Sequence, residues 1–178
     1  MPGIPDLAFR AAHTADAAAL VLLVNSAYRG DSSRVGWTTE ADLLGGQRTD
    51  AGEIARLIET ENSLLLLALG DEEIVGSVHL ERVNATTAYL GMLVIKPVLQ
   101  GRGLGSRLMQ AAEVWARDEW DVIRVEMQVI TLRKELIAYY ERRGYHRTGE
   151  MRPFPTAPEF GLPKVDNLQF AVLEKLLR

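Results

Sequence analysis

Six consecutive residues, Gln100-Gly101-Arg102-Gly103-Leu104-Gly105, form the segment with the clearest chemical signature. They follow an apolar stretch typical of a strand and lead into a helix whose apolar face carries Leu104, Leu108, Ala112 and Trp115. A glycine-rich turn before a helix leaves several backbone N–H groups unpaired, and the helix dipole adds partial positive charge there. Glycine also lets phosphate oxygens approach the backbone closely. The segment therefore predicts a binding site for a phosphate or pyrophosphate.

Two familiar phosphate-binding loops do not fit this segment. A Walker loop requires Gly-Lys followed by Ser or Thr, and the segment has no such run. A dinucleotide fingerprint requires a third glycine three residues after the second, but that position, counted from Gly103, is Ser106. The pattern that remains is Gln-x-x-Gly-x-Gly, matched by Gln100, Gly103 and Gly105.

The surrounding sequence alternates between helical and strand periodicity, which predicts an α/β (α+β mixed) protein with one mixed sheet and helices on both faces. Asp16 is expected to cap the first helix, Gly144 to end the fourth in a left-handed conformation, and Gly91 to mark a bulge or a close approach inside a strand. Residues 30–46, with one helical turn near 40–44, and residues 152–164 are predicted loops. We predict strands around Phe9 and over 64–69, 74–80, 87–95, 123–129, 145–149 and 168–176, and helices over 17–28, 51–61, 104–115 and 132–143.

Composition sets broad limits on function. The chain has 178 residues, 47% hydrophobic and 25% charged, which is typical of one globular domain over 1–178. It has no cysteine, no signal-peptide pattern and no apolar run long enough to cross a bilayer, so we expect a cytoplasmic protein without a membrane role. The net charge of −4 argues against nucleic-acid binding. Residues 96–147 nevertheless carry ten Lys or Arg against seven Asp or Glu, which indicates either a local anion site or a solvated helix surface.

A second block, Ala138-Tyr139-Tyr140-Glu141-Arg142-Arg143-Gly144-Tyr145, accompanies the glycine loop. With Ile95-Lys96-Pro97 before that loop, the sequence resembles the GNAT acetyltransferases over about Ile74 to Tyr145. The resemblance implies a single GNAT-like domain with a mostly antiparallel sheet of about six or seven strands, splayed at the cofactor site. It also implies acetyl-CoA as acyl donor.

The resemblance implies roles for several residues. Leu93, Val94 and Ile95 would pair with the pantetheine arm where the strand over 122–130 splays away, and the amide near Leu93 would donate to the thioester oxygen. The loop from Gln100 to Ser106 would hold the pyrophosphate, which adds Gly101, Arg102 and Leu104 to the predicted cofactor site. Tyr140 would be the general acid, with a packed core aromatic as the alternative. Arg133 stands where many members have Asn, so it is expected either to reach a cofactor phosphate or to cover the helix surface.

The acceptor side is less defined by the sequence. Glu126 is our first candidate for the general base, followed by Glu81 with His79 on the same strand, although each also fits a solvated strand position. Tyr28, Arg29, Trp37 and Glu81 are the predicted substrate-binding residues, and an exposed Arg29 or Arg48 would suit an acceptor carboxylate. His13 and His146 have no spacing typical of metal ligands, so no metal is predicted.

Three functions remain open at this point. The first is acetylation of a small-molecule amine. The second is N-acetylation of a protein or peptide, which requires an open groove. The third is a non-catalytic acyl-CoA sensor, which would bind the cofactor without transferring its acyl group. We expect no nucleic-acid or membrane partner and leave a homodimer open.

Overall fold

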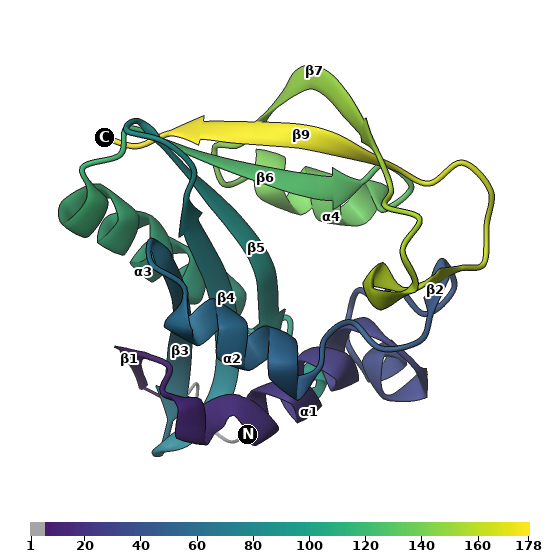
Figure 1. The fold of residues 1–178 in the computed structure, drawn as a ribbon, viewed down its shortest axis with the longest axis horizontal. Helices are drawn as coiled ribbons and strands as arrows, with labels where there is room; N and C mark the ends of the chain where they lie inside the picture. The colour runs from purple at the N-terminus through teal and green to yellow at the C-terminus, as the bar shows by residue number, and fades with distance from the viewer. Residues whose placement is uncertain (1–5) are drawn as a thin grey trace.

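The computed structural model describes residues 6–178 and is built around one seven-stranded sheet with the order β1-β3-β4-β5-β6-β9-β7 (Figure 1). Only β5 and β6 pair in parallel, and every other neighbouring pair is antiparallel. This architecture confirms the predicted mixed, mostly antiparallel sheet. The strands are β1 (Leu7–Ala11), β3 (Ser63–Gly70), β4 (Glu73–Arg82), β5 (Thr87–Ile95), β6 (Arg124–Ile130), β7 (His146–Pro153) and β9 (Gln169–Leu176).

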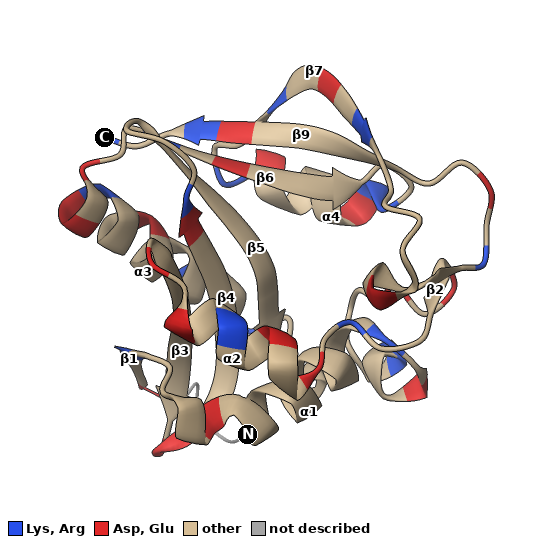
Figure 2. Ribbon diagram, viewed as in Figure 1, with Lys and Arg blue, Asp and Glu red and all other residues tan. Residues whose placement is uncertain are grey.

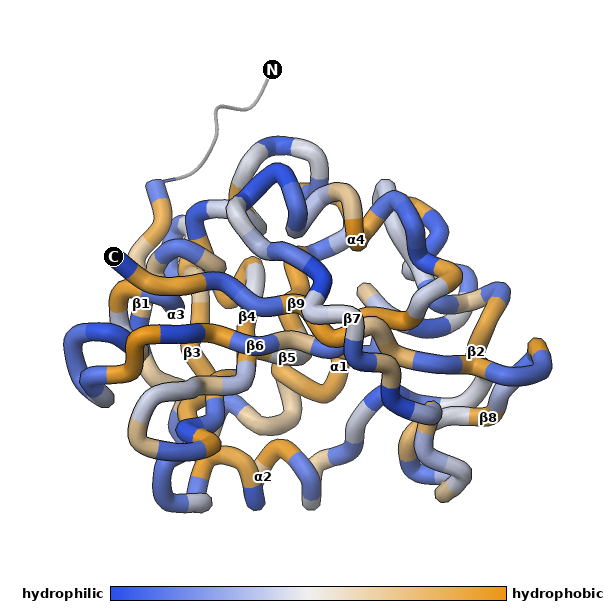
Figure 3. Tube along the Cα trace, turned by 90° about the horizontal axis from the view of Figure 1, so that it is seen from above, coloured by the Kyte–Doolittle hydropathy of each residue, from blue (hydrophilic) through white to orange (hydrophobic). Residues whose placement is uncertain are grey.

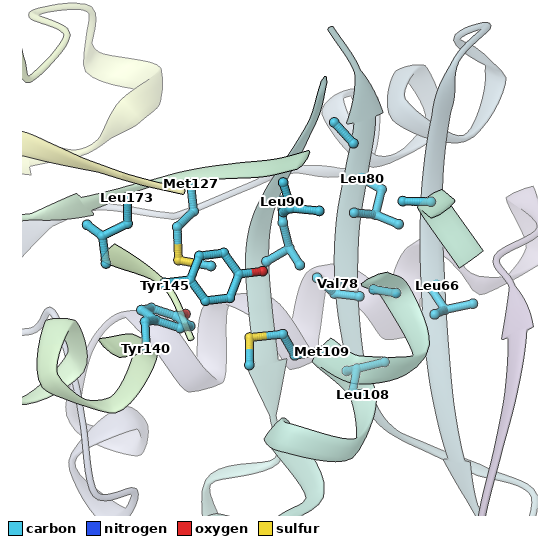
Figure 4. Packing of buried hydrophobic residues seen from close by; sticks show 14 of the residues in the cluster. Leu66, Val78, Leu80, Leu90, Leu108, Met109, Met127, Tyr140, Tyr145 and Leu173 are labelled. Carbon is cyan, nitrogen blue, oxygen red and sulfur yellow. The ribbon is translucent and has the colours of Figure 1, made fainter. Parts of the chain in front are cut away.

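Helices cover both faces of the sheet because its central strands are apolar on both sides. Along β3, Leu65 and Leu67 pack with the helices α1 (Ala17–Tyr28) and α2 (Ala51–Glu59). The alternate residues Leu64 and Leu66 pack in the other core, with α3 (Leu104–Trp120) and α4 (Lys134–Glu141). Figure 4 shows part of this second core, and Figure 3 shows α2 alternating between hydrophobic and hydrophilic residues at the edge of the molecule.

The sheet opens between β5 and β6. Their pairing covers three residue pairs, from Thr87 with Arg124 to Tyr89 with Glu126, and then stops. Beyond that point β5 continues along β4, whereas β6 continues along β9 as far as Ile130. The resulting wedge is visible in Figure 1 and confirms the predicted splay.

A β-bulge lies at the mouth of this wedge. Ser77 is opposite Val94 and His79 is opposite Gly91, so Met92 and Leu93 together face one residue of β4. Met92 takes a φ of 49°, a left-handed conformation that a bulky side chain rarely adopts. A Cβ on Gly91 would lie 2.6 Å from the Tyr89 ring, so this glycine permits a close approach beside the bulge.

Several local predictions need correction. Asp16 occupies the N-cap position of α1 as predicted, but its side chain does not cap the helix, because a short 3-10 turn, η1 (Thr14–Asp16), precedes it and the carboxylate accepts from the His13 N–H instead. A hydrogen bond from Arg10 lowers the pKa of Asp16 to about 2.

Helix α3 extends five residues beyond Trp115, where the Trp115 and Trp120 rings meet edge to face at 4.8 Å. Gly144 has the predicted left-handed conformation, with a φ of 93°.

Two predicted loops contain regular structure that joins them. The strands β2 (Leu44–Gly45) and β8 (Leu162–Pro163) pair with each other in a small second sheet. The same loops contain the 3-10 turns η2 (Asp31–Val35) and η4 (Pro158–Phe160), and a third turn, η3 (Pro97–Leu99), follows β5. Among residues 6–178, no helix combines the length and the apolar character needed to span a bilayer.

Candidate active site

The predicted phosphate loop lies at the N-terminus of α3 with its backbone accessible. Gly101 and Gly103 have φ values of 75° and 79°, a conformation that favours glycine. A Cβ on either would meet no atom within 4 Å, so ligand oxygens have room to approach. Gly103 is the N-cap of α3 and offers no side-chain hydrogen bond, which leaves the amides at the helix start available for an anion. The Leu104 side chain is buried, so this residue contributes only its backbone.

The polar side chains of the predicted loop are hydrogen-bonded within the protein or exposed to solvent. Gln100 Oε1 accepts from the Trp37 N–H at 3.1 Å, and its Nε2 donates to the Ile95 carbonyl at 3.1 Å. The Gln100 side chain thus fixes the loop to its neighbours. Ser106 is engaged by Arg143 Nε, and Arg102 is exposed outside the cavity lining.

Two arginines at the end of α4 supply positive charge that the motif did not identify. Arg142 and Arg143 line a cavity of about 250 Å³ together with Gly101 and Gly103. The Arg143 guanidinium lies 3.5 Å from the centroid of the Tyr139 ring, which holds it beside the loop. The excess of basic residues over 96–147 was the sequence signal for these two side chains.

Two further cavities meet where the strands splay. A narrow one of about 70 Å³ follows Leu93, Val94 and Ile95 from the glycine loop into the wedge. A larger one of about 360 Å³ lies on the other side, over His79, Glu81 and neighbouring residues of the sheet. The walls they share are formed by Tyr28, Leu93, Arg133, Leu136 and Tyr140.

Tyr140 combines burial with an available hydroxyl at this junction. Tyr140 is 7% exposed, and its ring centroid lies 5.4 Å from that of Tyr139 and 6.0 Å from that of Tyr145. Figure 4 shows the rings of Tyr140 and Tyr145 side by side. In the described part of the chain no hydrogen bond engages its hydroxyl. Burial raises the pKa of Tyr140 well above its usual value, so the phenol keeps its proton. Tyr140 is therefore a packed aromatic residue that keeps its proton and lines both cavities.

The β5 bulge presents its backbone at the same junction. The Tyr28 hydroxyl donates to the Leu93 carbonyl at 3.4 Å, and burial raises the pKa of Tyr28 to about 12. Leu93 has no register partner on β4, and β6 has already diverged at this level. The strand edge at Leu93 is thus open to an extended ligand.

A buried charge network corrects the predictions for Arg29 and Arg133. Arg29, expected at the surface, is 5% exposed and donates to Glu40 at 3.1 Å and to three backbone carbonyls. Arg133 is 6% exposed and donates to the other Glu40 oxygen at 3.0 Å and to Thr38 at 2.7 Å. Arg133 therefore does not cover the helix surface but lies in the wall between the two cavities.

The candidate general bases differ in the groups that they contact. Glu81, Tyr89 and Glu126 are cross-strand neighbours on one face of the sheet. Glu126 forms an ion pair with Arg152 at 3.0 Å and does not line the larger cavity, whereas Glu81 does. His79 also lines it, but burial lowers the pKa of this histidine to about 4, and its Nε2 lies 3.0 Å from Ser63 Oγ. The structure thus favours Glu81 over our first candidate, Glu126.

Trp37, which was predicted to bind the acceptor, lies on the glycine-loop side of the junction. Its ring centroid is 5.3 Å from that of Tyr139, and it lines the two cavities next to the glycine loop and not the larger one. Residues 6–178 contain no group of three or more His, Asp or Glu arranged to hold a metal ion.

Comparisons with known proteins agree with this geometry. The family model described as "Acetyltransferase (GNAT) family" matches residues 27–145, more than half of the chain. No curated protein matches significantly.

Three solved structures illustrate the likeness of fold. The yncA protein of Salmonella typhimurium, solved with its cofactor acetyl-CoA, is 18% identical with a TM-score of 0.70, covering 97% of this chain and 95% of that one. A spermidine N-acetyltransferase mutant from Vibrio cholerae is 16% identical with a TM-score of 0.69, over 96% and 93% of the chains. The ribosomal-protein-S18-alanine N-acetyltransferase of Escherichia coli is 15% identical with a TM-score of 0.69, over 96% and 94%.

The glycine loop, the splayed strands and the family match lead to one conclusion: the chain belongs to the GNAT family of acetyltransferases.

Proposed function

We propose that this protein transfers the acetyl group of acetyl-CoA directly to a primary amine of a small molecule. The observation that carries the proposal is the meeting of the two cavities at Leu93 and Tyr140. A donor entering from the glycine loop and an acceptor entering from the larger cavity would reach each other only at this wall. Such placement favours direct attack, because both reactants are held in position together.

The residues on the donor side fit acetyl-CoA. The amides at Gly101 and Gly103 and the nearby Arg142 and Arg143 suit its pyrophosphate, and the open edge of β5 at Leu93 suits its pantetheine arm. When bound, acetyl-CoA supplies an activated acetyl group as a thioester. The Leu93 N–H would polarise the carbonyl of that group, and the Tyr140 hydroxyl would give its proton to the departing sulfur.

The loops tied together beside the larger cavity support a small acceptor over a protein terminus. Pairing of β2 with β8 joins the loop after α1 to the loop before β9. Lys164 Nζ reinforces the junction by donating to the Ala41 carbonyl at 2.7 Å, and Arg29 donates to the Phe160 carbonyl at 3.2 Å. A peptide acceptor requires an open groove, which these ties would obstruct.

Thiol release over a panel of small amines, amino acids and short peptides tests the proposed function. We expect release with small amines and little with peptides. Binding of acetyl-CoA in calorimetry without release for any amine would instead support the non-catalytic sensor. Release confined to peptides would support the protein acetyltransferase.

We assign the general base to Glu81, and expect Glu81→Gln to lower kcat/KM about a hundredfold at neutral pH. A protonated amine cannot attack, and the cavity-lining carboxylate would take its proton directly or through water. The deficit should narrow as the pH approaches the pKa of the acceptor amine, because solvent then supplies the free base. A pH–rate profile of both proteins measures this.

Glu126→Gln is the matched control for Glu81, since Glu126 lies in the same cross-strand row but pairs with Arg152. It should leave kcat/KM close to the unmodified value. A larger loss of kcat/KM with Glu126→Gln than with Glu81→Gln would show that Glu126, and not Glu81, is the general base.

Gly103→Ala should weaken acetyl-CoA binding about tenfold, which corresponds to about 1.4 kcal/mol. The added Cβ would enter the space where phosphate oxygens approach the amides of α3. Because Gly103 has a φ of 79°, the variant also carries backbone strain. Calorimetric titration with acetyl-CoA measures the affinity.

Gly149→Ala separates these two effects. Gly149 has a similar φ of 88°, and a Cβ added there would also meet no atom within 4 Å, but this glycine lies on β7, away from the loop. Both variants should lose comparable stability, and only Gly103→Ala should lose affinity. Equal affinity losses would mean that the loop does not hold the pyrophosphate.

A further inference from the structure

Four arginines line the larger cavity, and they divide into two kinds. Arg29 and Arg133 share the Glu40 carboxylate and are buried. Arg48 and Arg56 also line the cavity, but among residues 6–178 neither guanidinium has an ion-pair or hydrogen-bond partner. The cavity thus contains two guanidinium groups without a direct ion-pair partner, and Glu53, which also lines it, accepts from the Thr49 hydroxyl instead.

Two kinds of contact hold Arg48 in place: backbone hydrogen bonds to Asn25 and stacking of its guanidinium on the Tyr28 ring. Asn25 Oδ1 accepts from the Arg48 N–H at 2.7 Å and from the Thr49 N–H at 3.1 Å, which fixes the segment to α1. The Arg48 guanidinium carbon lies 5.4 Å from the centroid of the Tyr28 ring. Since the Tyr28 hydroxyl contacts the Leu93 carbonyl, the Tyr28 side chain bridges Arg48 and Leu93.

Arg56 approaches the same space from α2. The charges of Arg48 and Arg56 both act on His79 at the floor of the cavity, adding to the burial that lowers the pKa of that histidine. Both arginines also line a hollow of about 590 Å³, together with Phe160 and the acidic residues Asp50, Glu53 and Glu159. Figure 2 shows basic segments on α2 and in the loops next to β2. The pair therefore lies where the larger cavity meets this hollow, which Leu93 and Tyr140 do not line.

This arrangement points to the chemistry of the acceptor. Arg48 is half-buried and Arg56 is exposed. A guanidinium without a counter-ion gains from a carboxylate, because charge-assisted and bidentate hydrogen bonds replace water contacts. The carboxylate of Glu81 remains available on the same cavity for the amine. A cavity lined by two guanidinium groups without ion-pair partners and by the Glu81 carboxylate matches a molecule that carries both an anionic group and an amine.

We infer that the acceptor is a small amino-acid-like zwitterion, whose anionic group is bound by Arg48 and Arg56 while its amine faces Leu93. The inference rests on the proposed function and specifies its substrate class. It distinguishes this acceptor from polyamines, which carry no anionic group for Arg48 and Arg56 to bind.

Thiol release with matched sets of acceptors tests the inference. Each set comprises an amino acid, its primary amide and the amine left by its decarboxylation, with the amine at the α, β or γ carbon. We expect kcat/KM for the best acid to exceed that of its amide and of its decarboxylated amine by about tenfold to a hundredfold.

Arg48→Gln and Arg56→Gln identify the side chains responsible. Each variant should lower kcat/KM for the acid about tenfold or more and leave the value for the amide nearly unchanged, so that the acid-to-amide ratio falls toward one. Arg117→Gln, at an exposed arginine of α3 paired with Asp118, is the matched control and should preserve the ratio. Arg56 is exposed, so its variant should fold even if Arg48→Gln disturbs Tyr28.

Two results would overturn the inference and leave the proposed function standing. One is turnover of the amides or decarboxylated amines as fast as, or faster than, the acids. The other is an equal loss for acid and amide in both variants, which a purely structural role would produce. Absence of thiol release with every amine, from protein that binds acetyl-CoA, would contradict the proposed function and the inference together.

Discussion

Tyr140→Phe is expected to lower kcat by about a hundredfold to ten-thousandfold while leaving acetyl-CoA affinity nearly unchanged. The substitution removes one hydroxyl and keeps the ring that packs between Tyr139 and Tyr145. Without that hydroxyl the thiolate of coenzyme A would leave without a proton in a poorly solvated site. Single-turnover kinetics and calorimetric titration measure the two quantities separately.

The raised pKa of Tyr140 is consistent with a donor role. Burial disfavours the phenolate, so the group stays protonated at working pH. The same burial disfavours the thiolate and makes it a stronger base, which favours proton transfer from the phenol to sulfur.

Tyr139→Phe is the neighbouring control. The Tyr139 hydroxyl lies 3.5 Å from Ser106 Oγ, beside the glycine loop and away from the larger cavity. This variant should keep kcat near the unmodified value. Unchanged kcat in Tyr140→Phe, or an equal fall in both variants, would remove Tyr140 from the mechanism.

Glu40→Gln should lower the free energy of unfolding by about 3 to 5 kcal/mol. The carboxylate is 8% exposed and faces Arg29 and Arg133 at 3.1 and 3.0 Å. A neutral amide cannot compensate two buried guanidinium groups, and its NH2 group would face one of them. Urea unfolding followed by far-ultraviolet circular dichroism gives the change.

Asp42→Asn provides the contrast in the same loop. Asp42 pairs with Arg34 at 2.7 Å, but both side chains are exposed, so solvent screens the interaction. The unfolding midpoint of this variant should barely move. A similarly small shift for Glu40→Gln would show that water reaches the network and that it does not hold the loops over the cavity.

The Glu40 network also connects stability with function. Arg29 fixes residues 45 and 47 and the Phe160 carbonyl, whereas Arg133 lies at the start of α4, the helix that carries Tyr140. The loops beside the larger cavity and the helix that carries Tyr140 are thus attached to one carboxylate. Their relative position depends on interactions that no single helix or strand provides.

The amino-acid sequence by itself determined the elements and the glycine loop. Strand and helix periodicity reports which face of a segment is buried, and this requirement is local, so α1 begins and ends as predicted and β5 does too. The left-handed turns at Gly103 and Gly144 are likewise local, because they depend on the absence of a side chain. The ends of α3 and β7 were misjudged: α3 continues to Trp120, whose ring meets that of Trp115 within the helix, and β7 continues to Pro153, where it pairs with β9.

Only the tertiary structure decided which charged residues are free and which are paired. Glu40 and Arg133 are 93 positions apart, and Arg29 and Phe160 are 131 apart, so no local spacing encodes their contact. The same holds for Glu126, which forms an ion pair with Arg152, and for Trp37, which lies against Tyr139 and does not line the larger cavity. Sequence types name the residues able to carry charge or donate protons, but the burial and partners that set their roles exist only once distant segments have packed together.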